Sequence, residues 1–312
     1  MYDKVKLFYP RTAVTPDVVQ YLDEAKKQTD LKTGEVCTFG NLEGLKVGIY
    51  TGGISIIGSL PKYLYPNNIY PLDRNTTTTA IEKLSDALHL DVSGAKVTGL
   101  EFGGTFMMRQ PIENYLSRLG EMPRLQRYHF EVGTLYYKPR GKQQLRVFAF
   151  YDKIADAAVK GMSLPAGFEG ANLLKYEMRF SGRLSQQLGE EVRASTLSER
   201  PFYNKLVSKY QDAYFSITKS NHIKTDVMTK IKTVSDAYAY DVFVARLIAQ
   251  SDQSQIAGFL DELKTNNVFP DRKSYYRLKQ KIYDVSGKAG VSVSDELIRE
   301  LDDEVKNVGA YM

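Results

Sequence analysis

Hydrophobic and polar residues alternate in short runs over the first half of the chain. A period of two residues is typical of β-strands buried on one face. The pattern predicts strands at residues 4–9, 44–50, 54–60, 96–106, 127–132, 134–137, 145–151 and 172–180. Thr51-Gly-Gly53 separates the second and third of these runs and predicts a hairpin turn.

Helical periodicity, with hydrophobic residues three and four positions apart, appears between these strands and dominates after Ser181. It predicts helices at residues 17–27, 80–90, 111–119, 154–160, 183–188, 191–197, 201–215, 224–233, 235–250, 254–263, 271–283 and 294–308, with a loop at 59–68. We therefore expect an α+β protein with an antiparallel-rich central sheet and flanking helices. A boundary near 216–221 predicts a first domain over 1–215 and a helical accessory domain over 216–312.

Composition places the chain among soluble globular proteins, because 43% of its 312 residues are hydrophobic and 25% are charged. No apolar run approaches the ~20 residues of a membrane span, and the first residues lack the apolar core of a secretory signal. We therefore expect a cytoplasmic protein without membrane contact. The net charge of +5 permits nucleic-acid binding without requiring it.

Metal chemistry is restricted by the single cysteine, Cys37, and by three histidines that are far apart in the sequence. These counts exclude an intramolecular disulfide and a cysteine-based metal cluster. A metal site would rely on carboxylates, which favour Mg²⁺ or Mn²⁺ over Zn²⁺. The sequence also lacks a P-loop and a Rossmann glycine fingerprint.

The first candidate for chemistry is Tyr151, at the end of a predicted hairpin whose turn contains Pro139 and Gly141. If the strand continues, Lys153 shares a face with Tyr151. A neighbouring ammonium group would favour the phenolate and lower the tyrosine pKa, which suits a nucleophile. The alternative is a buried aromatic residue followed by a solvated lysine.

Carboxylates on three predicted strands are the second candidate. Glu101 shares a face with Gly99 and Gly103, which would leave room for a metal ion or substrate, although an edge strand facing solvent is equally consistent. Glu177 lies between Lys175 and Arg179 on the polar face of its strand. That charge row suggests a site or, alternatively, cross-strand ion pairs on an exposed face.

A third carboxylate, Glu131, shares a strand face with His129. Polar residues of this kind are also typical of the wet face of a half-buried strand.

Basic helices in the last third alternate lysine and arginine with tyrosine, most densely over residues 272–283. Such helices suit a phosphate backbone with exposed bases, although a solvated helix face has the same composition.

Taken in order, five segments resemble one protein family. They are 57–64 with Asn67-Asn68, Val97-Thr-Gly-Leu-Glu-Phe-Gly-Gly-Thr-Phe106, Gly133-Thr-Leu-Tyr-Tyr137, Phe150-Tyr-Asp-Lys153 and Asn172-Leu-Leu-Lys-Tyr-Glu-Met-Arg-Phe180. Over roughly residues 1–215 they resemble the phage and plasmid replication initiators related to the gene II and gene X proteins of filamentous phage. Rolling-circle plasmid Rep proteins of the Rep_trans group are more distant relatives. The resemblance implies a Rep nickase-like fold with ferredoxin-like elements.

The resemblance also implies a DNA-nicking and joining enzyme that forms a 5′-phosphotyrosine. Tyr151 would be the nucleophile, with Tyr136, Tyr137 and Tyr176 as alternatives, and Lys153 would hold the phosphate. Glu101 and Glu177 would bind Mg²⁺ or Mn²⁺, with Glu131 or, alternatively, His129 completing the metal shell. They would replace the His-hydrophobic-His pair of better-known nickases, which is absent here. Contacts with DNA would come from Lys138, Arg140, Lys142, Arg146, Arg179, Arg272, Lys273 and Arg277.

Two other functions fit the same sequence. A plasmid mobilisation relaxase uses the same tyrosine chemistry, and a non-enzymatic origin- or operator-binding protein would use the scaffold alone. The second alternative predicts that Tyr151 and the carboxylates do not share a site. Origin DNA is the expected partner in each case, and a homodimer is left open.

Overall fold

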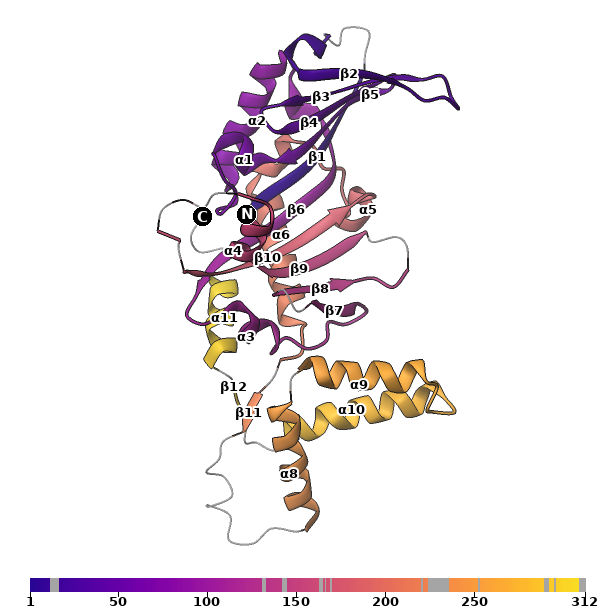
Figure 1. Ribbon diagram of the computed structural model, residues 1–312, viewed down its shortest axis with the longest axis vertical. Helices are drawn as coiled ribbons and strands as arrows, with labels where there is room; N and C mark the ends of the chain where they lie inside the picture. The colour runs from indigo at the N-terminus through magenta and orange to yellow at the C-terminus, as the bar shows by residue number, and fades with distance from the viewer. Residues whose placement is uncertain are drawn as a thin grey trace.

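The computed structural model describes residues 1–11, 17–130, 133–141, 145–162, 165, 167–168, 170–219, 221–223, 236–251, 253–288, 292–294 and 296–308. The protein is α+β, with a ten-stranded antiparallel sheet as its central element (Figure 1).

The sheet has the strand order β2-β3-β4-β5-β1-β6-β10-β9-β8-β7. Strands β1 and β6 lie at its centre, so residues before β6 build one half of the sheet and later residues build the other. The bounds are β1 Tyr2–Pro10, β2 Asp23–Thr29, β3 Val36–Leu42, β4 Leu45–Tyr50, β5 Gly53–Ser59, β6 Lys96–Met108, β7 Gln126–Phe130, β8 Thr134–Lys138, β9 Arg146–Asp152 and β10 Asn172–Ser181.

Some helices connect these strands, and the others come after the last strand of the sheet in the sequence. Their bounds are α1 Leu60–Leu64, α2 Arg74–Leu88, α3 Ile112–Leu116, α4 Lys153–Val159, α5 Leu184–Leu188, α6 Arg200–Phe215, α8 Asp236–Gln250, α9 Gln253–Thr265, α10 Arg272–Lys288 and α11 Glu296–Asn307. Short 3₁₀ turns lie at Val19–Tyr21, Val92–Gly94 and Ser195–Ser198, and β11 (Asn221–Ile223) pairs with β12 (Ser292–Ser294).

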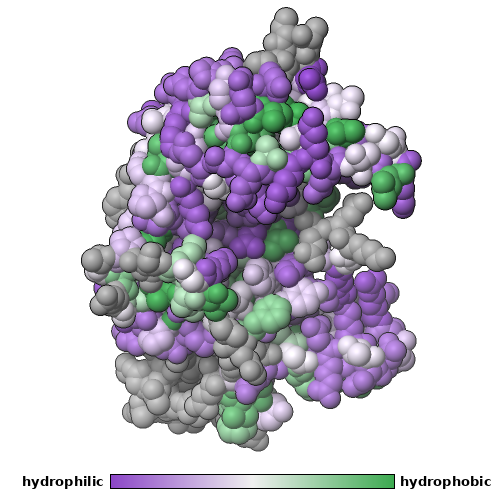
Figure 2. Space-filling model, turned by 45° about the horizontal axis from the view of Figure 1, so that its top comes forward, coloured by the Kyte–Doolittle hydropathy of each residue, from purple (hydrophilic) through white to green (hydrophobic). Residues whose placement is uncertain are grey.

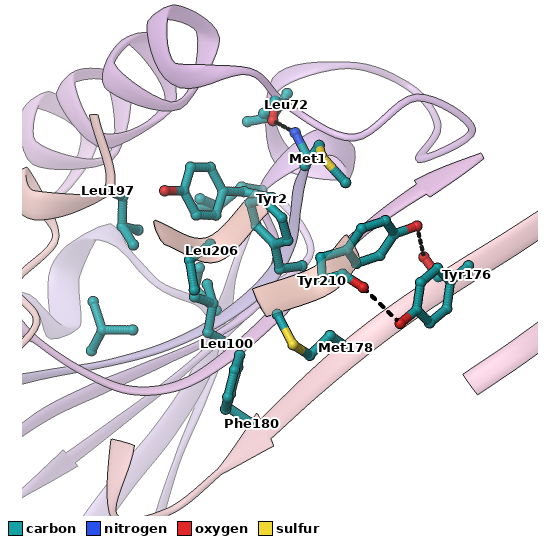
Figure 3. Close-up of a cluster of buried hydrophobic side chains, with 14 of the residues drawn as sticks. Met1, Tyr2, Leu72, Leu100, Tyr176, Met178, Phe180, Leu197, Leu206 and Tyr210 are labelled. Atoms are coloured by element: carbon teal, nitrogen blue, oxygen red, sulfur yellow. Dashed lines mark hydrogen bonds between the residues drawn. The ribbon is translucent and has the colours of Figure 1, made fainter. Parts of the chain in front are cut away.

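One face of the sheet forms the hydrophobic core with α2, α6 and α11. At its centre the Tyr176 ring of β10 stacks on the Tyr210 ring of α6, with centroids 4.2 Å apart. Each hydroxyl donates a 3.2 Å hydrogen bond to the other residue's carbonyl oxygen (Figure 3). Burial of such aromatic pairs is a large part of the hydrophobic contribution to stability.

The last helix, α11, packs in this core, against α3, α6 and β6. Ile298, Leu301 and Val305 are buried against the sheet domain. Tyr214 of α6 donates a 2.8 Å hydrogen bond to Asp302. The expected accessory segment 216–312 thus includes an element of the main core, whereas α8, α9 and α10 lie beyond the β7 edge of the sheet (Figure 1).

Several elements differ from the sequence expectation. The helix expected at 17–27 is wrong, because this region holds a 3₁₀ turn and β2, whose side chains are all exposed and therefore give no hydrophobic alternation. Strand β3 was not predicted, the helix expected at 191–197 is only a 3₁₀ turn at Ser195–Ser198, and the predicted loop 59–68 contains α1. The predicted helix 224–233 lies outside the described residues.

Among the described helices, none combines the length and apolar character that a membrane span requires.

Candidate active site

The face of the sheet opposite the core carries polar side chains in cross-strand rows. Glu177 of β10 pairs with Gly103 of β6 and with Ala149 of β9, and Ala149 pairs with Tyr136 of β8. In the flanking rows, Lys175 pairs with Tyr151, and Arg179 pairs with Glu101. Because side chains two residues apart share a face, the Lys175, Glu177 and Arg179 row lies on one side of the sheet, as the alternation predicts.

Glu177 is hydrogen-bonded to both Tyr151 and Arg179. The Tyr151 hydroxyl donates a 2.8 Å hydrogen bond to Glu177 Oε1. Arg179 donates two hydrogen bonds, of 2.9 Å from Nε and 2.7 Å from Nη2, to Glu177 Oε2. The Glu177 side chain is 2% exposed, so its charge is compensated by Arg179 and not by bulk water.

The pKa of Tyr151 is raised well above its ordinary value. Burial is the largest cause, and the neighbouring Glu177 carboxylate adds to it, while Arg179 acts in the opposite direction. The expectation that Lys153 lowers this pKa is therefore wrong. A buried phenol beside a carboxylate stays protonated at neutral pH, and the carboxylate is placed to accept its proton.

Lys153 begins helix α4 instead of continuing the strand of Tyr151. Its Nζ donates a 3.0 Å hydrogen bond to Asn68 Oδ1, and only 2% of the side chain is exposed. Burial, followed by the charge of Lys175, lowers the pKa of Lys153. The sheet turns into helix at this point because Asp152 caps α4, accepting hydrogen bonds from the amides of Ile154 and Ala155.

Asp3 is the counter-ion of two buried lysines. Its Oδ2 lies 3.4 Å from Lys175 Nζ, and its Oδ1 accepts a 2.7 Å hydrogen bond from the Ser59 hydroxyl. Burial alone would raise the pKa of Asp3, but the charges of Lys175 and Lys153 and the Ser59 hydrogen bond outweigh it, so the pKa is lowered. Asp3 could not be identified from the sequence, because only the folded chain places it near both lysines.

Glu101 lies on the same face, one row from Glu177. Burial and then the charge of Glu177 raise its pKa, while Arg179 opposes this shift. The space predicted beside its two glycines is filled at Gly103, whereas Gly99 and Glu101 line a cavity. A β-carbon at Gly103 would clash with the Tyr176 carbonyl oxygen and lie 3.1 Å from Glu177 Cγ, and one at Gly99 would lie 2.9 Å from Lys6 Cδ. Gly103 therefore lets β10 approach closely and does not leave an empty site.

A cavity of about 410 Å³ opens next to this cluster on the polar face. Glu101 and Arg179 line one side, and Tyr136 and Lys138 line the other. Lys4 and Lys6 of β1 continue its basic lining toward the sheet centre. The cavity is large enough for a nucleotide-sized group and is positively charged, which suits a phosphodiester.

The structure separates the four candidate tyrosines. Tyr137 and Tyr176 are fully buried on the core face, where Tyr137 donates a 2.7 Å hydrogen bond to the Gly120 carbonyl. Tyr151 and Tyr136 lie on the polar face, and Tyr136 lines the cavity. Only Tyr151 has a carboxylate hydrogen-bonded to its hydroxyl among the four in the described structure.

The predicted DNA contacts fall in different places. Lys138 and Arg179 line the cavity, whereas Arg140 lines a separate pocket of about 330 Å³ beside α9 and α10. Arg146 pairs with Phe180 and therefore lies on the core side of the sheet, away from Glu177. The others on α10, Arg272, Lys273 and Arg277, are exposed, and Lys142 lies outside the described residues.

The predicted three-carboxylate metal site is not assembled by the described residues, which contain no group of three metal-ligating side chains. Glu131 lies outside them, and His129 is 2.8 Å from Glu113. Glu101 and Glu177 have the donor chemistry for Mg²⁺, which proteins bind with one or two carboxylates plus water and substrate phosphates. Glu101 also lines the cavity, where a bound cation would reduce its repulsion with Glu177; burial and this repulsion raise the pKa of Glu101.

Comparison with known proteins adds no relative. No protein-family model matches the sequence, and a search of curated proteins finds no significant match.

Proposed function

We propose that the protein is a rolling-circle replication initiator that nicks and rejoins single-stranded origin DNA through a 5′-phosphotyrosine. The proposal includes the finer fold expectation, a Rep nickase-like scaffold with ferredoxin-like elements. The observation that carries it is the 2.8 Å hydrogen bond between Tyr151 and Glu177, on a basic face that also holds Arg179 and Glu101.

In the proposed step the Tyr151 oxygen attacks the scissile phosphorus. The tyrosyl O–P bond forms, the P–O3′ bond breaks, and the 3′ oxygen takes up a proton to become the free 3′-hydroxyl that primes synthesis. Reversal of the same exchange rejoins the strand. Because the phosphotyrosine ester retains the energy of the broken bond, no nucleotide cofactor is consumed.

Proton transfer is the part for which the cluster gives a specific role. The raised pKa of Tyr151 leaves little phenolate at neutral pH, so the proton must leave as the phenol attacks. Glu177 Oε1 is within hydrogen-bond reach of that proton, which is the geometric requirement for a general base. Arg179 holds Glu177 through its other oxygen and presents a guanidinium to the cavity, where it would contact a non-bridging phosphate oxygen.

Glu101 and Glu177 would hold a Mg²⁺ or Mn²⁺ ion. When bound, such an ion would polarise the phosphate and offset charge on its oxygens. Lys153 and Lys175 add buried positive charge behind Tyr151, with Asp3 as their shared counter-ion.

A non-enzymatic DNA-binding role would leave Tyr151 and the acidic residues scattered. The contact of Tyr151 with Glu177, and the position of Glu101 one row away on the same face, therefore favour the nicking proposal over that alternative.

Covalent capture tests the proposal. The protein is incubated with a randomised single-stranded DNA library and Mn²⁺, and adducts that survive denaturation are isolated and sequenced. We expect an adduct that maps to Tyr151 by mass spectrometry and disappears in Tyr151→Phe. Absence of any adduct, or an unchanged yield in Tyr151→Phe, would reject the proposal.

A further inference from the structure

We propose that Tyr128 and Phe130 of β7, with Lys138 of β8, form a platform on which bases of a single DNA strand stack as it enters the active site. This inference rests on the proposed function and adds the route of its substrate. The three residues are called the β7–β8 platform below.

The platform belongs to the same face of the sheet as the proposed nucleophile. Tyr128 pairs with Tyr136, which pairs with Ala149, the cross-strand partner of Glu177. Phe130 pairs with Thr134, which pairs with Tyr151. Continuous cross-strand rows therefore connect each exposed aromatic residue with one member of the Tyr151–Glu177 pair.

The two rings are unusually exposed for their size. Tyr128 is 39% exposed and Phe130 is 49% exposed, although both lie in a strand. Tyr136, behind them, meets the Phe130 ring edge to face at 6.0 Å and fixes its position. Large exposed aromatic residues on a sheet face offer π surfaces to unpaired bases.

The ammonium group of Lys138 lies close to the rings of Tyr136 and Tyr128. Lys138 Nζ is 4.4 Å from the centroid of the Tyr136 ring and 5.6 Å from that of Tyr128. Its ammonium group therefore lies close to the exposed Tyr128 ring. A cation next to exposed aromatic rings suits the phosphates and bases of a single strand.

The distance to the chemistry suits a short stretch of DNA. Strands β7 and β10 are three strand spacings apart, about 14 Å. The cavity lined by Tyr136, Lys138 and Arg179 lies over part of the sheet between β7 and β10. Hydrophilic residues cover most of the molecular face seen in Figure 2, which is hollowed near its middle.

The chemistry favours single-stranded DNA over other occupants. In a duplex the π faces of the bases are already stacked, so the duplex would gain only from the cations. A hydrophobic protein partner would have to bury Lys138 without a described acidic partner close to it.

Binding to a labelled oligodeoxythymidylate tests the platform in the Tyr151→Phe background, which removes cleavage. Tyr128→Ala and Phe130→Ala should each weaken binding by about 5- to 150-fold, the range that corresponds to about 1–3 kcal/mol per stacked base. Tyr128→Phe should retain binding, because it keeps the ring. The control is Phe215→Ala on α6, whose ring is 41% exposed and has Lys219 Nζ 4.7 Å from its centroid, but lies away from this face.

Three outcomes would overturn the inference: unchanged affinity in both alanine variants, an equal loss in Phe215→Ala, or an equal loss for duplex DNA. Photocrosslinking of a bromodeoxyuridine-substituted oligonucleotide should label Tyr128 or Phe130, and labelling only at other residues would also contradict the inference.

If wild-type protein forms no covalent adduct while the alanine variants lose single-strand affinity, the nicking proposal fails and the platform stands. If capture requires Tyr151 but the variants bind normally, the platform fails alone.

Discussion

The Tyr151 hydroxyl donates a 2.8 Å hydrogen bond to Glu177 Oε1, from one strand to its neighbour in the sheet. This contact replaces Lys153, the residue expected to activate the Tyr151 nucleophile, with Glu177. A cation beside the phenol would have stabilised the phenolate, whereas burial and the Glu177 carboxylate raise the pKa of Tyr151. In the proposed mechanism this carboxylate would accept the phenol proton during attack.

Glu177→Gln should therefore slow adduct formation more than DNA binding. Loss of a general base typically costs about 10²–10⁴-fold in rate. Single-turnover capture with saturating oligonucleotide measures the rate, and fluorescence anisotropy measures binding. A variant that captures DNA at the wild-type rate would exclude Glu177 as the base.

Removal of the Tyr137 hydroxyl should affect stability but not chemistry. Tyr137→Phe leaves the Gly120 carbonyl without its 2.7 Å hydrogen bond in the core, which costs roughly 1–3 kcal/mol in the free energy of unfolding. Adduct yield at a temperature where the variant is folded should equal that of wild type. A selective loss of adduct in a folded Tyr137→Phe protein would show that the nucleophile has been assigned to the wrong face.

Glu101→Gln should raise the melting temperature at neutral pH. The folded-state pKa of Glu101 is raised by burial and by Glu177, so its stabilising contribution is complete at low pH and is lost as pH rises through the folded pKa. The difference between variant and wild type should vanish below about pH 4.3, where Glu101 is protonated in both states. Thermal melts across pH measure this, and an acid-side advantage for the variant would contradict it.

Asp3→Asn should destabilise the protein strongly. It removes the shared counter-ion of Lys153 and Lys175, and breaking a buried ion pair typically costs about 3–5 kcal/mol. In the wild type, Asp3 has a lowered pKa, so its stabilising contribution is present above pH of about 3.9 and is lost as pH falls through the folded pKa. Denaturant unfolding should show the loss at pH 7, and the variant should be less sensitive to acid than wild type.

The accessory helices should be removable without loss of the core. Ile223 pairs with Ser292, so residues 224–291 can be replaced by a short Asn-Gly turn between two paired strand ends. This variant should keep its melting temperature and its adduct yield but bind duplex DNA less tightly, because α10 supplies Arg272, Lys273 and Arg277. Truncation after Asn221 is the contrasting variant, and it should unfold more easily because it removes Ile298, Leu301 and Val305 from the core.

Most of the sheet was predictable because apolar and polar residues alternate along its strands, although both faces of β10 are buried. The alternation in β10 assigned Lys175, Glu177 and Arg179 to a common side, and the register confirms this arrangement. Strand β2 could not be predicted in this way, since its residues are exposed on both faces and its pairing with β3 depends on main-chain hydrogen bonds.

The site was predictable in part for the same reason. Strand periodicity identified Glu177 and Glu101 as residues of the polar face, but it could not indicate that Lys153 would turn away at the start of α4. Nor could it identify Asp3, which comes from a strand at the opposite end of the sequence, or the contact of Arg179 with Glu177, which fixes the charge balance.

The paired strands β11 and β12 flank the segment that contains α8, α9 and α10. The chain therefore leaves the main body and returns to it at one place, the β11–β12 pair. A replacement segment with a different length or different surface residues would therefore affect the β11–β12 pair first. The strands that carry Tyr151 and Glu177 would keep their register. Under the proposed function, the choice of DNA target could therefore diversify in the helical segment while the strand-transfer chemistry is preserved in the sheet.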